Sequence, residues 1–344
     1  MTTKVDGEET ASSRTRRVAS PATGEPVRLF SREWFAGLAV RYVMVLVMLL
    51  VIAYFSYRSA RFSTPDNLVT ILVAAAPFAL IALGQTLVIL TGGIDLSVGS
   101  VIAVSAMAGA ATAKANPGQV WLTVLVAMLV GLAVGCINGF LVSRINVPPF
   151  IATLGTLTAG SGMAYVIGGG APINGLPAEF GAIANTKILG LQIPVLLMVV
   201  GIIALAVIMK RTTYGMRVYA VGGNRNAAEI AGINAKNVLF SVYAFSGLLA
   251  GLSGVMLASR VISGPPNLGQ GYELDAIAAV VIGGASLMGG RGSVWGTALG
   301  LLMIQTLNNG LDILVVPAYW QDVIKGVLIV AAVAVDVWSS RRRT

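Results

Sequence analysis

Histidine is absent from this chain of 344 residues, and cysteine occurs once, as Cys136. A disulfide within one chain is therefore excluded. Zinc sites built from clustered His and Cys are excluded as well, and so are catalytic triads that use His. The sequence also has no phosphate-binding loop, GxxxxGK followed by Ser or Thr, so it should not bind ATP by that route. These absences count against a self-contained hydrolase or ATPase, and we expect neither a metal nor a cofactor.

Charged residues are scarce too, at 11% of the chain against 56% hydrophobic residues. A soluble domain carries about 25% charged residues, and a soluble chain this apolar could not cover its own core. The composition therefore predicts a protein whose solvent is a lipid bilayer. The net charge of +9 comes from basic residues that cluster in the expected cytosolic loops, so membrane topology explains it and no nucleic-acid partner is expected.

The chain divides into a polar tail over residues 1–36, expected to be disordered and cytosolic, and a transmembrane domain over residues 37–344. A membrane-spanning helix needs about 20 apolar residues. The sequence thus predicts an all-α polytopic protein with about ten transmembrane helices, of which the eighth is short for a full span. The expected helices cover residues 40–57, 68–90, 96–113, 120–142, 150–167, 193–209, 238–258, 275–288, 297–314 and 323–338.

The distribution of basic residues indicates the orientation. With the N-terminus in the cytosol, 17 of the 23 Lys and Arg residues fall on the cytosolic side, including the cluster Arg341–Arg343. This asymmetry fits the positive-inside rule. An odd number of helices would place that cluster outside. We therefore expect both termini to be cytosolic.

The longest expected cytosolic loop, from Lys210 to about Asn237, contains a segment with helix signals. Asn226 can cap a short helix whose first turn includes Glu229, and Gly232 can end it. One interpretation is a short surface helix that contacts a partner. The alternative is a connector that lies on anionic lipid through its basic residues.

A second candidate segment, Thr91–Ser100, interrupts an apolar stretch. Gly92 and Gly93 break a helix, and Asp95 or Ser97 can cap the next one. It is either a tight cytosolic turn or a break at membrane depth that lines a translocation pathway. Irregular backbone at that depth must face protein or water, and an ionisable residue there is a functional candidate.

Three acidic or aromatic residues, Tyr272, Glu273 and Asp275, are expected at the outer start of the eighth helix. They either charge and cap a helix N-terminus or dock an extracellular partner through its Arg and Lys residues.

Three amides, Gln305, Asn308 and Asn309, lie within the ninth expected helix. They either form interhelical hydrogen bonds or offer weak, exchangeable hydrogen bonds to a neutral, hydroxyl-rich sugar in a pathway.

Several motifs, in order along the chain, resemble the permease subunits of ribose-type (monosaccharide) ABC importers. They are Leu90–Ser100, Gly222–Asn224, Ala231–Asn234, Ser246–Gly251, Gly271–Val280 and Leu307–Leu311. The resemblance covers nearly all of the chain after its tail. It implies a multi-pass protein of the bacterial cytoplasmic membrane that imports a small neutral sugar without being an enzyme itself.

The same resemblance implies three protein partners. They are a second copy of the chain in a homodimer, a cytosolic ABC ATPase with its cassettes on one chain or two, and an extracytoplasmic sugar-binding protein. In related importers the long cytosolic loop supplies the helix that couples the permease to the ATPase. The matching residues here are Ala227, Ala228, Glu229, Ile230, Ala231, Gly232, Ile233 and Asn234.

Two other functions stay open from the residues. An ion-coupled secondary sugar transporter usually needs acidic or His groups inside the membrane. Apart from Asp95, the expected membrane interior is nearly free of them, which favours ATP on a partner as the energy source. The other alternative is an ABC permease for a different small polar solute.

Overall fold

The computed structural model describes residues 17–19, 26–28 and 32–341. Most of the tail over residues 1–36 lies outside the described residues, so its disorder stays a prediction. Its described parts are the antiparallel strands β1 (Arg17–Ala19) and β2 (Pro26–Arg28). The first helix, α1 (Arg32–Arg58), begins before residue 37, so the expected boundary between tail and membrane domain lies within a helix.

The rest of the described chain is mainly helical. Its elements are α2 (Pro65–Leu90), α3 (Val98–Ala115), α4 (Val120–Ser143), α5 (Pro149–Ile167), α6 (Ala178–Asn185), β3 (Lys187–Ile188), β4 (Leu191–Gln192), α7 (Ile193–Arg211), α8 (Thr213–Gly223), α9 (Arg225–Ile230), α10 (Ala235–Val261), α11 (Tyr272–Ile282), α12 (Val294–Ile313) and α13 (Ala318–Arg341). The centre of the bundle is α10, which packs against α2, α3 and α4.

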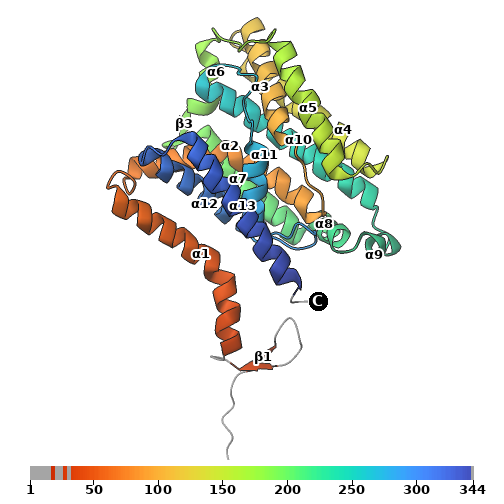
Figure 1. Ribbon diagram of the computed structural model, residues 1–344. Helices are drawn as coiled ribbons and strands as arrows, with labels where there is room; N and C mark the ends of the chain where they lie inside the picture. Colours follow the sequence, from red (N-terminus) through yellow and green to blue (C-terminus); the bar gives the residue numbers. More distant parts are fainter. Residues whose placement is uncertain (1–16, 20–25, 29–31, 342–344) are drawn as a thin grey trace, which may run out of the picture.

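The bundle has two ends, which we name after the short helices that mark them. At the α6 end, the backbone N–H of Ala184 donates a hydrogen bond to Ser259 Oγ near the C-terminus of α10. At the α9 end, α8 and α9 lie directly before the N-terminus of α10. Figure 1 shows α6 and α9 far apart, with the start of α1 and the end of α13 both directed away from α6.

Six helices among the described residues are long and apolar enough to cross a membrane: α2, α3, α4, α5, α7 and α10. The chain is thus a multi-pass membrane protein, but the expected count of about ten spans is not confirmed. The helix expected over residues 275–288 stops at Ile282 as α11, because Gly283 and the left-handed Gly284 (φ +87°) end it.

Glycines permit the close approach of α4 and α10. A Cβ at Gly131 would overlap the carbonyl oxygen of Gly247, and one at Gly135 would overlap that of Tyr243. Small residues let helix backbones pack closely in lipid, where van der Waals contact replaces the hydrophobic effect. These contacts hold the centre of the bundle together.

Helix α11 begins in the middle of the bundle. The ring of Tyr272, its first residue, packs on Phe78 with ring centroids 4.2 Å apart. Phe78 is at the midpoint of α2, which has 26 residues. The 11 residues of α11 rise about 16 Å, roughly half of the ~30 Å hydrocarbon thickness of a bilayer. The chain therefore returns to mid-depth between α10 and α11, and α11 covers the half towards the α9 end.

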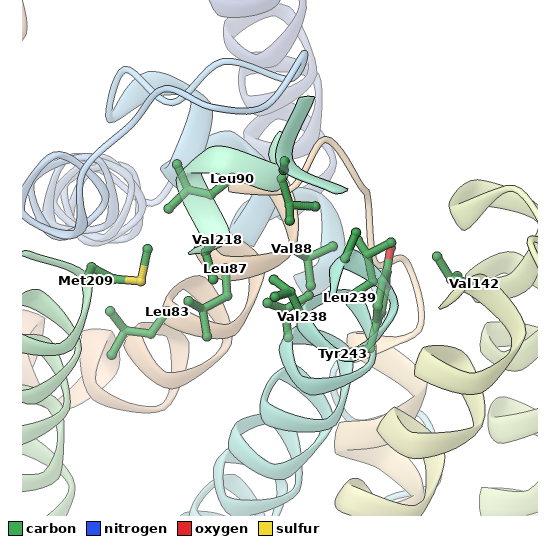
Figure 2. Close-up of a cluster of buried hydrophobic side chains, with 14 of the residues drawn as sticks. Leu83, Leu87, Val88, Leu90, Val142, Met209, Val218, Val238, Leu239 and Tyr243 are labelled. Carbon is green, nitrogen blue, oxygen red and sulfur yellow. The ribbon is translucent and has the colours of Figure 1, made fainter. Parts of the chain in front are cut away.

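A buried apolar cluster joins the elements of the α9 end (Figure 2). Leu87, Val88 and Leu90 of α2 contact Val218 of α8 and Val238 of α10 within it. This cluster attaches α8 firmly to the transmembrane helices.

Candidate functional site

The chain between α2 and α3 carries a buried carboxylate. Asp95 is 1% exposed and accepts three hydrogen bonds. Ser97 donates two of them to Oδ1, from its backbone N–H at 3.0 Å and its Oγ at 2.6 Å. Ser246 of α10 donates the third, from Oγ to Oδ2 at 2.9 Å. Burial of a carboxylate in an apolar medium is costly unless such donors surround it.

Further polar residues extend this contact to α4 and α5. Asn138 Nδ2 donates to Ser97 Oγ at 2.8 Å, and Thr156 Oγ1 donates to Asn138 Oδ1 at 2.8 Å. Ser246 lies 11 residues into α10, about 16 Å from its start. Asp95 and Ser97 of the Thr91–Ser100 segment are therefore buried inside the bundle, whereas Gly92 near its start is exposed. Whether Asp95 and Ser97 serve a pathway stays a prediction.

A cavity of about 240 Å³ opens at the α9 end beside this break. Gly92, Gly93, Asn146, Arg225 and Tyr243 are among its lining residues. The Tyr243 hydroxyl is buried without a hydrogen-bond partner among the described residues. A Cβ at Gly93 would overlap this hydroxyl, so glycine makes room for the tyrosine.

Three glycine-rich segments meet at the α9 end, and we call this contact the glycine junction. It consists of Leu90, Gly92, Gly222, Gly289 and Gly290. The Gly290 N–H donates to the Leu90 carbonyl at 2.9 Å. A Cβ at Gly222 would overlap that carbonyl, and one at Gly289 would approach the Gly92 nitrogen to 2.8 Å. Backbone thus touches backbone between α8, the end of α2 and the loop before α12.

The short helix expected in the long loop is present as α9. Asn224 caps it, since its Oδ1 accepts from the Ala227 N–H at 3.0 Å. The expected cap, Asn226, is therefore wrong by two residues. Gly232 takes φ +83° and ends the turn as expected.

The side chains of the 227–234 segment divide into anchors and exposed groups. Ala228 is buried in the apolar cluster of the α9 end, and Ile230 is 88% exposed. Glu229 pairs with Arg225 of its own helix at 3.2 Å. Ala231 is exposed and Ile233 packs partly against the cluster. Asn234 caps α10 through the Asn237 N–H at 3.0 Å.

Helix α8 lies in the same loop and was not expected. Thr212 caps it, accepting from the Gly215 N–H at 3.4 Å. The signal was present in the sequence, because Gly215, Val218 and Val221 recur every three residues and form its buried face.

Tyr272, Glu273 and Asp275 do not lie at an outer end, which corrects the expected position. Tyr272 packs on Phe78 at mid-depth, as described above. Asp275 is 8% exposed and pairs with Lys325 of α13 at 3.7 Å. Whether they contact a binding protein stays a prediction. They also mean that the interior holds more carboxylates than Asp95 alone.

The amides of α12 have mixed surroundings. Asn309 exchanges two hydrogen bonds with Asn67 of α2, at 2.8 and 2.9 Å, which is the interhelical bonding that was one of its two interpretations. Gln305 Nε2 and Asn308 Oδ1 are buried without a partner among the described residues. A pathway role for these amides stays a prediction.

A second cavity, which we call the mid-depth cavity, has a volume of about 410 Å³. Helices α3 and α5 and the segment before α11 line it. Its polar side chains include Ser100, Ser161, Tyr165, Gln270 and Glu273. Of these five side chains, the sequence analysis named Glu273, and Ser100 ends the candidate segment Thr91–Ser100. Ser161, Tyr165 and Gln270 were not noticed, because they lie outside the motifs.

The described structure thus defines a helical membrane protein with interrupted helices, buried polar groups and internal cavities, features that transporters share. The model of the family described as branched-chain amino acid transport system / permease component matches residues 67–333, and the chain belongs to this permease family. It is accordingly a transport component and not an enzyme.

Curated relatives match most of the chain. Ribose import permease protein RbsC of Bacillus subtilis (strain 168) is 41% identical over 309 residues, 89% of this chain and 95% of the relative. Ribose import permease protein RbsC of Escherichia coli (strain K12) is 39% identical, covering 90% and 96%. D-allose transport system permease protein AlsC of the same strain is 36% identical, covering 94% and 98%. No solved structure matches the chain significantly.

Proposed function

We propose that this chain is the membrane permease of a bacterial ABC importer that moves a monosaccharide inward with ATP hydrolysed by a partner. The observation that carries this proposal is the set of relatives. Their names specify import of ribose, transport of D-allose and, for a further relative of Bifidobacterium longum, import of fructose. These substrates share one chemistry, a small neutral polyhydroxyl ring. The proposal therefore specifies the class of sugar and not one sugar.

The α9 end is the cytosolic end in this proposal. Arg144, Lys210, Arg211, Arg217 and Lys236 all lie there and are exposed, as the positive-inside rule requires. With ten crossings of the bilayer, counting the loop and half-helix of α11 as one, both termini are cytosolic.

The cytosolic ATPase docks on an apolar surface of this end. Met216, Ile230 and Met288 are 62%, 88% and 82% exposed and come from α8, α9 and the loop before α12. Exposed apolar side chains of this size favour a protein partner. A second copy of the chain completes the importer, and an extracytoplasmic sugar-binding protein delivers sugar to the α6 end.

Motion of the ATPase reaches the membrane through contacts described above. The coupling segment is Ala227–Asn234, anchored by Ala228 in the buried cluster. Helix α8 precedes it and touches the end of α2 through the glycine junction. Since backbone contacts cannot yield by side-chain rotation, a shift of α8 displaces Leu90 and the Thr91–Ser97 break.

The test is reconstitution in proteoliposomes. The permease, its ATPase and its binding protein should together import labelled ribose, allose or fructose when ATP is present on the ATPase side. ATP with a hydrolysis-deficient ATPase is the control and should give no uptake. Sugar uptake by this chain alone, driven by a proton gradient, would instead identify a secondary transporter.

A further inference from the structure

The mid-depth cavity, which is open on one side, has the acidic residue Glu273 in its lining. Oε2 of Glu273 is buried and has no hydrogen-bond partner among the described residues. Of the ion pairs formed by described residues, none includes Glu273. A Cβ at Gly99 of α3 would overlap this oxygen, so the absence of a side chain there leaves room for the carboxylate. An acidic side chain with a buried, unpartnered oxygen inside a membrane protein is costly and is a functional candidate.

The cavity lies about halfway across the bundle, and a translocated solute must pass this level. Thr158, which lines it, is at the midpoint of α5, and Glu273 is in the first turn of α11, beside the midpoint of α2. Thr158 and Gln270 are exposed in the single chain. Irregular backbone and polar side chains at this depth must face water or protein instead of lipid. The open side of the cavity therefore faces an aqueous path or a second copy.

The lining groups suit a neutral polyhydroxyl ligand. Ser161, Tyr165 and Gln270 can each donate and accept hydrogen bonds, whereas Glu273 only accepts when ionised. Sugar hydroxyls can therefore donate to Glu273 and exchange bonds with the other groups. A volume of about 410 Å³ lies within the ~300–1,000 Å³ typical of small-molecule sites.

We propose that the mid-depth cavity is a monosaccharide-binding station within the permease, with Glu273 as its central hydrogen-bond acceptor. This proposal rests on the proposed sugar-import function and deepens it. The binding protein then does not select the sugar alone, because the permease receives the sugar at a site of its own. Binding is weak enough for release, since one carboxylate and a few neutral groups hold the ligand.

A labelling experiment tests the station directly. Ser161→Cys is introduced into the permease, assembled with its ATPase in proteoliposomes without binding protein. A thiol reagent is added, and mass spectrometry separates the label at position 161 from that at Cys136. Millimolar D-ribose, D-allose or D-fructose should slow labelling at position 161 several-fold. Ser63→Cys, at an exposed position between α1 and α2 and outside the cavity lining, should be labelled at the same rate with and without sugar.

The acceptor role is tested in the same assay by Glu273→Gln, which preserves shape and removes charge. The sugar concentration that protects position 161 should rise about ten-fold, as expected for losing a charge-assisted hydrogen bond. Transport at saturating binding protein should fall in parallel. Glu179→Gln, on the exposed side of α6, is the matched control for the labelling assay. Because this assay contains no binding protein, the variant should leave the protecting sugar concentration unchanged.

The outcomes separate this proposal from the general one. If the unaltered assembly imports no sugar, the proposed function fails. If it imports sugar but no sugar protects position 161, or Glu273→Gln behaves like the parent in both assays, the station proposal alone is overturned. Protection by Na⁺ without sugar would overturn it too, by identifying a cation site.

Discussion

Asp95 is the most buried charged residue in the described interior, and hydrogen-bond donors surround its carboxylate. The Ser97 backbone N–H, Ser97 Oγ and Ser246 Oγ all point to its carboxylate. Because both oxygens are engaged, the group connects the α2–α3 break to α10. Its role as a structural junction follows from this geometry independently of any contact with substrate.

Replacing Asp95 by Asn should therefore destabilise the protein. The amide keeps one acceptor oxygen and turns two N–H donors towards Ser97 or Ser246. We expect a loss of about 1–3 kcal/mol, the usual cost of an unsatisfied buried donor. Thermal unfolding of the purified permease in detergent would measure it as a lower midpoint.

The matched control is Asp322→Asn, since the Asp322 side chain is 74% exposed and its partner Lys325 keeps a second carboxylate, that of Asp275. Exposed pairs contribute about 0–1 kcal/mol, so this midpoint should hardly move. Equal midpoints for the two variants would contradict the assigned role of Asp95.

Individual residues were predicted unevenly from the sequence. Asp95 and Ser97 stood out because polar residues between glycines interrupt an apolar run. Glu273 was also noticed but was placed at the outer surface. A count of apolar residues assumes that each apolar run crosses the whole membrane. It therefore cannot reveal that the chain folds back to mid-depth before Tyr272.

The turn after α9 offers a test of coupling between the ATPase and the permease through the backbone angle of one residue. Gly232 has φ +83° and nothing within 4 Å of where a Cβ would be. A side chain there would strain the backbone but would not clash with a neighbour. Valine resists the left-handed region, whereas Asn tolerates it. Gly232→Val should uncouple ATP hydrolysis from sugar uptake several-fold, and Gly232→Asn should retain coupling.

Substrate-stimulated hydrolysis and uptake in the same proteoliposomes give the ratio of ATP to sugar. Glu229→Arg adds a second measurement, because it breaks the pair with Arg225 and reverses the charge offered to the ATPase. Unchanged ratios for both Gly232→Val and Glu229→Arg would mean that the contact with the ATPase lies elsewhere.

Long helices were the best predicted elements. The ranges expected at 120–142 and 150–167 correspond to α4 (Val120–Ser143) and α5 (Pro149–Ile167). Short elements were predicted less well. The buried face of α8 is only three residues long, and α11 ends at glycines that a hydropathy window averages away. The mid-depth cavity depends on contacts among three distant elements, which no local pattern encodes.

The arrangement of the whole chain predicts where its ends emerge. The start of α1 and the end of α13 both lie away from the α6 end (Figure 1). A fluorescent reporter that folds only in the cytosol should be active when fused after Thr344. The same reporter inserted after Gly190, in the β3–β4 turn of the α6 end, should be inactive. The opposite pattern would reverse the proposed orientation.

The short length of α11 also constrains how the protein is made. Its 11 residues are too few to be recognised as a span of about 20 residues during synthesis. The irregular segment before it gains Ile173 as a partner, which pairs with Gly264, and Tyr272 of α11 gains Phe78, once earlier helices are in place. We infer that residues 262–282 enter the bilayer late, guided by a bundle that already exists. The wall that carries Glu273 is then the last part of the cavity to be built, so an unfinished permease holds no sugar.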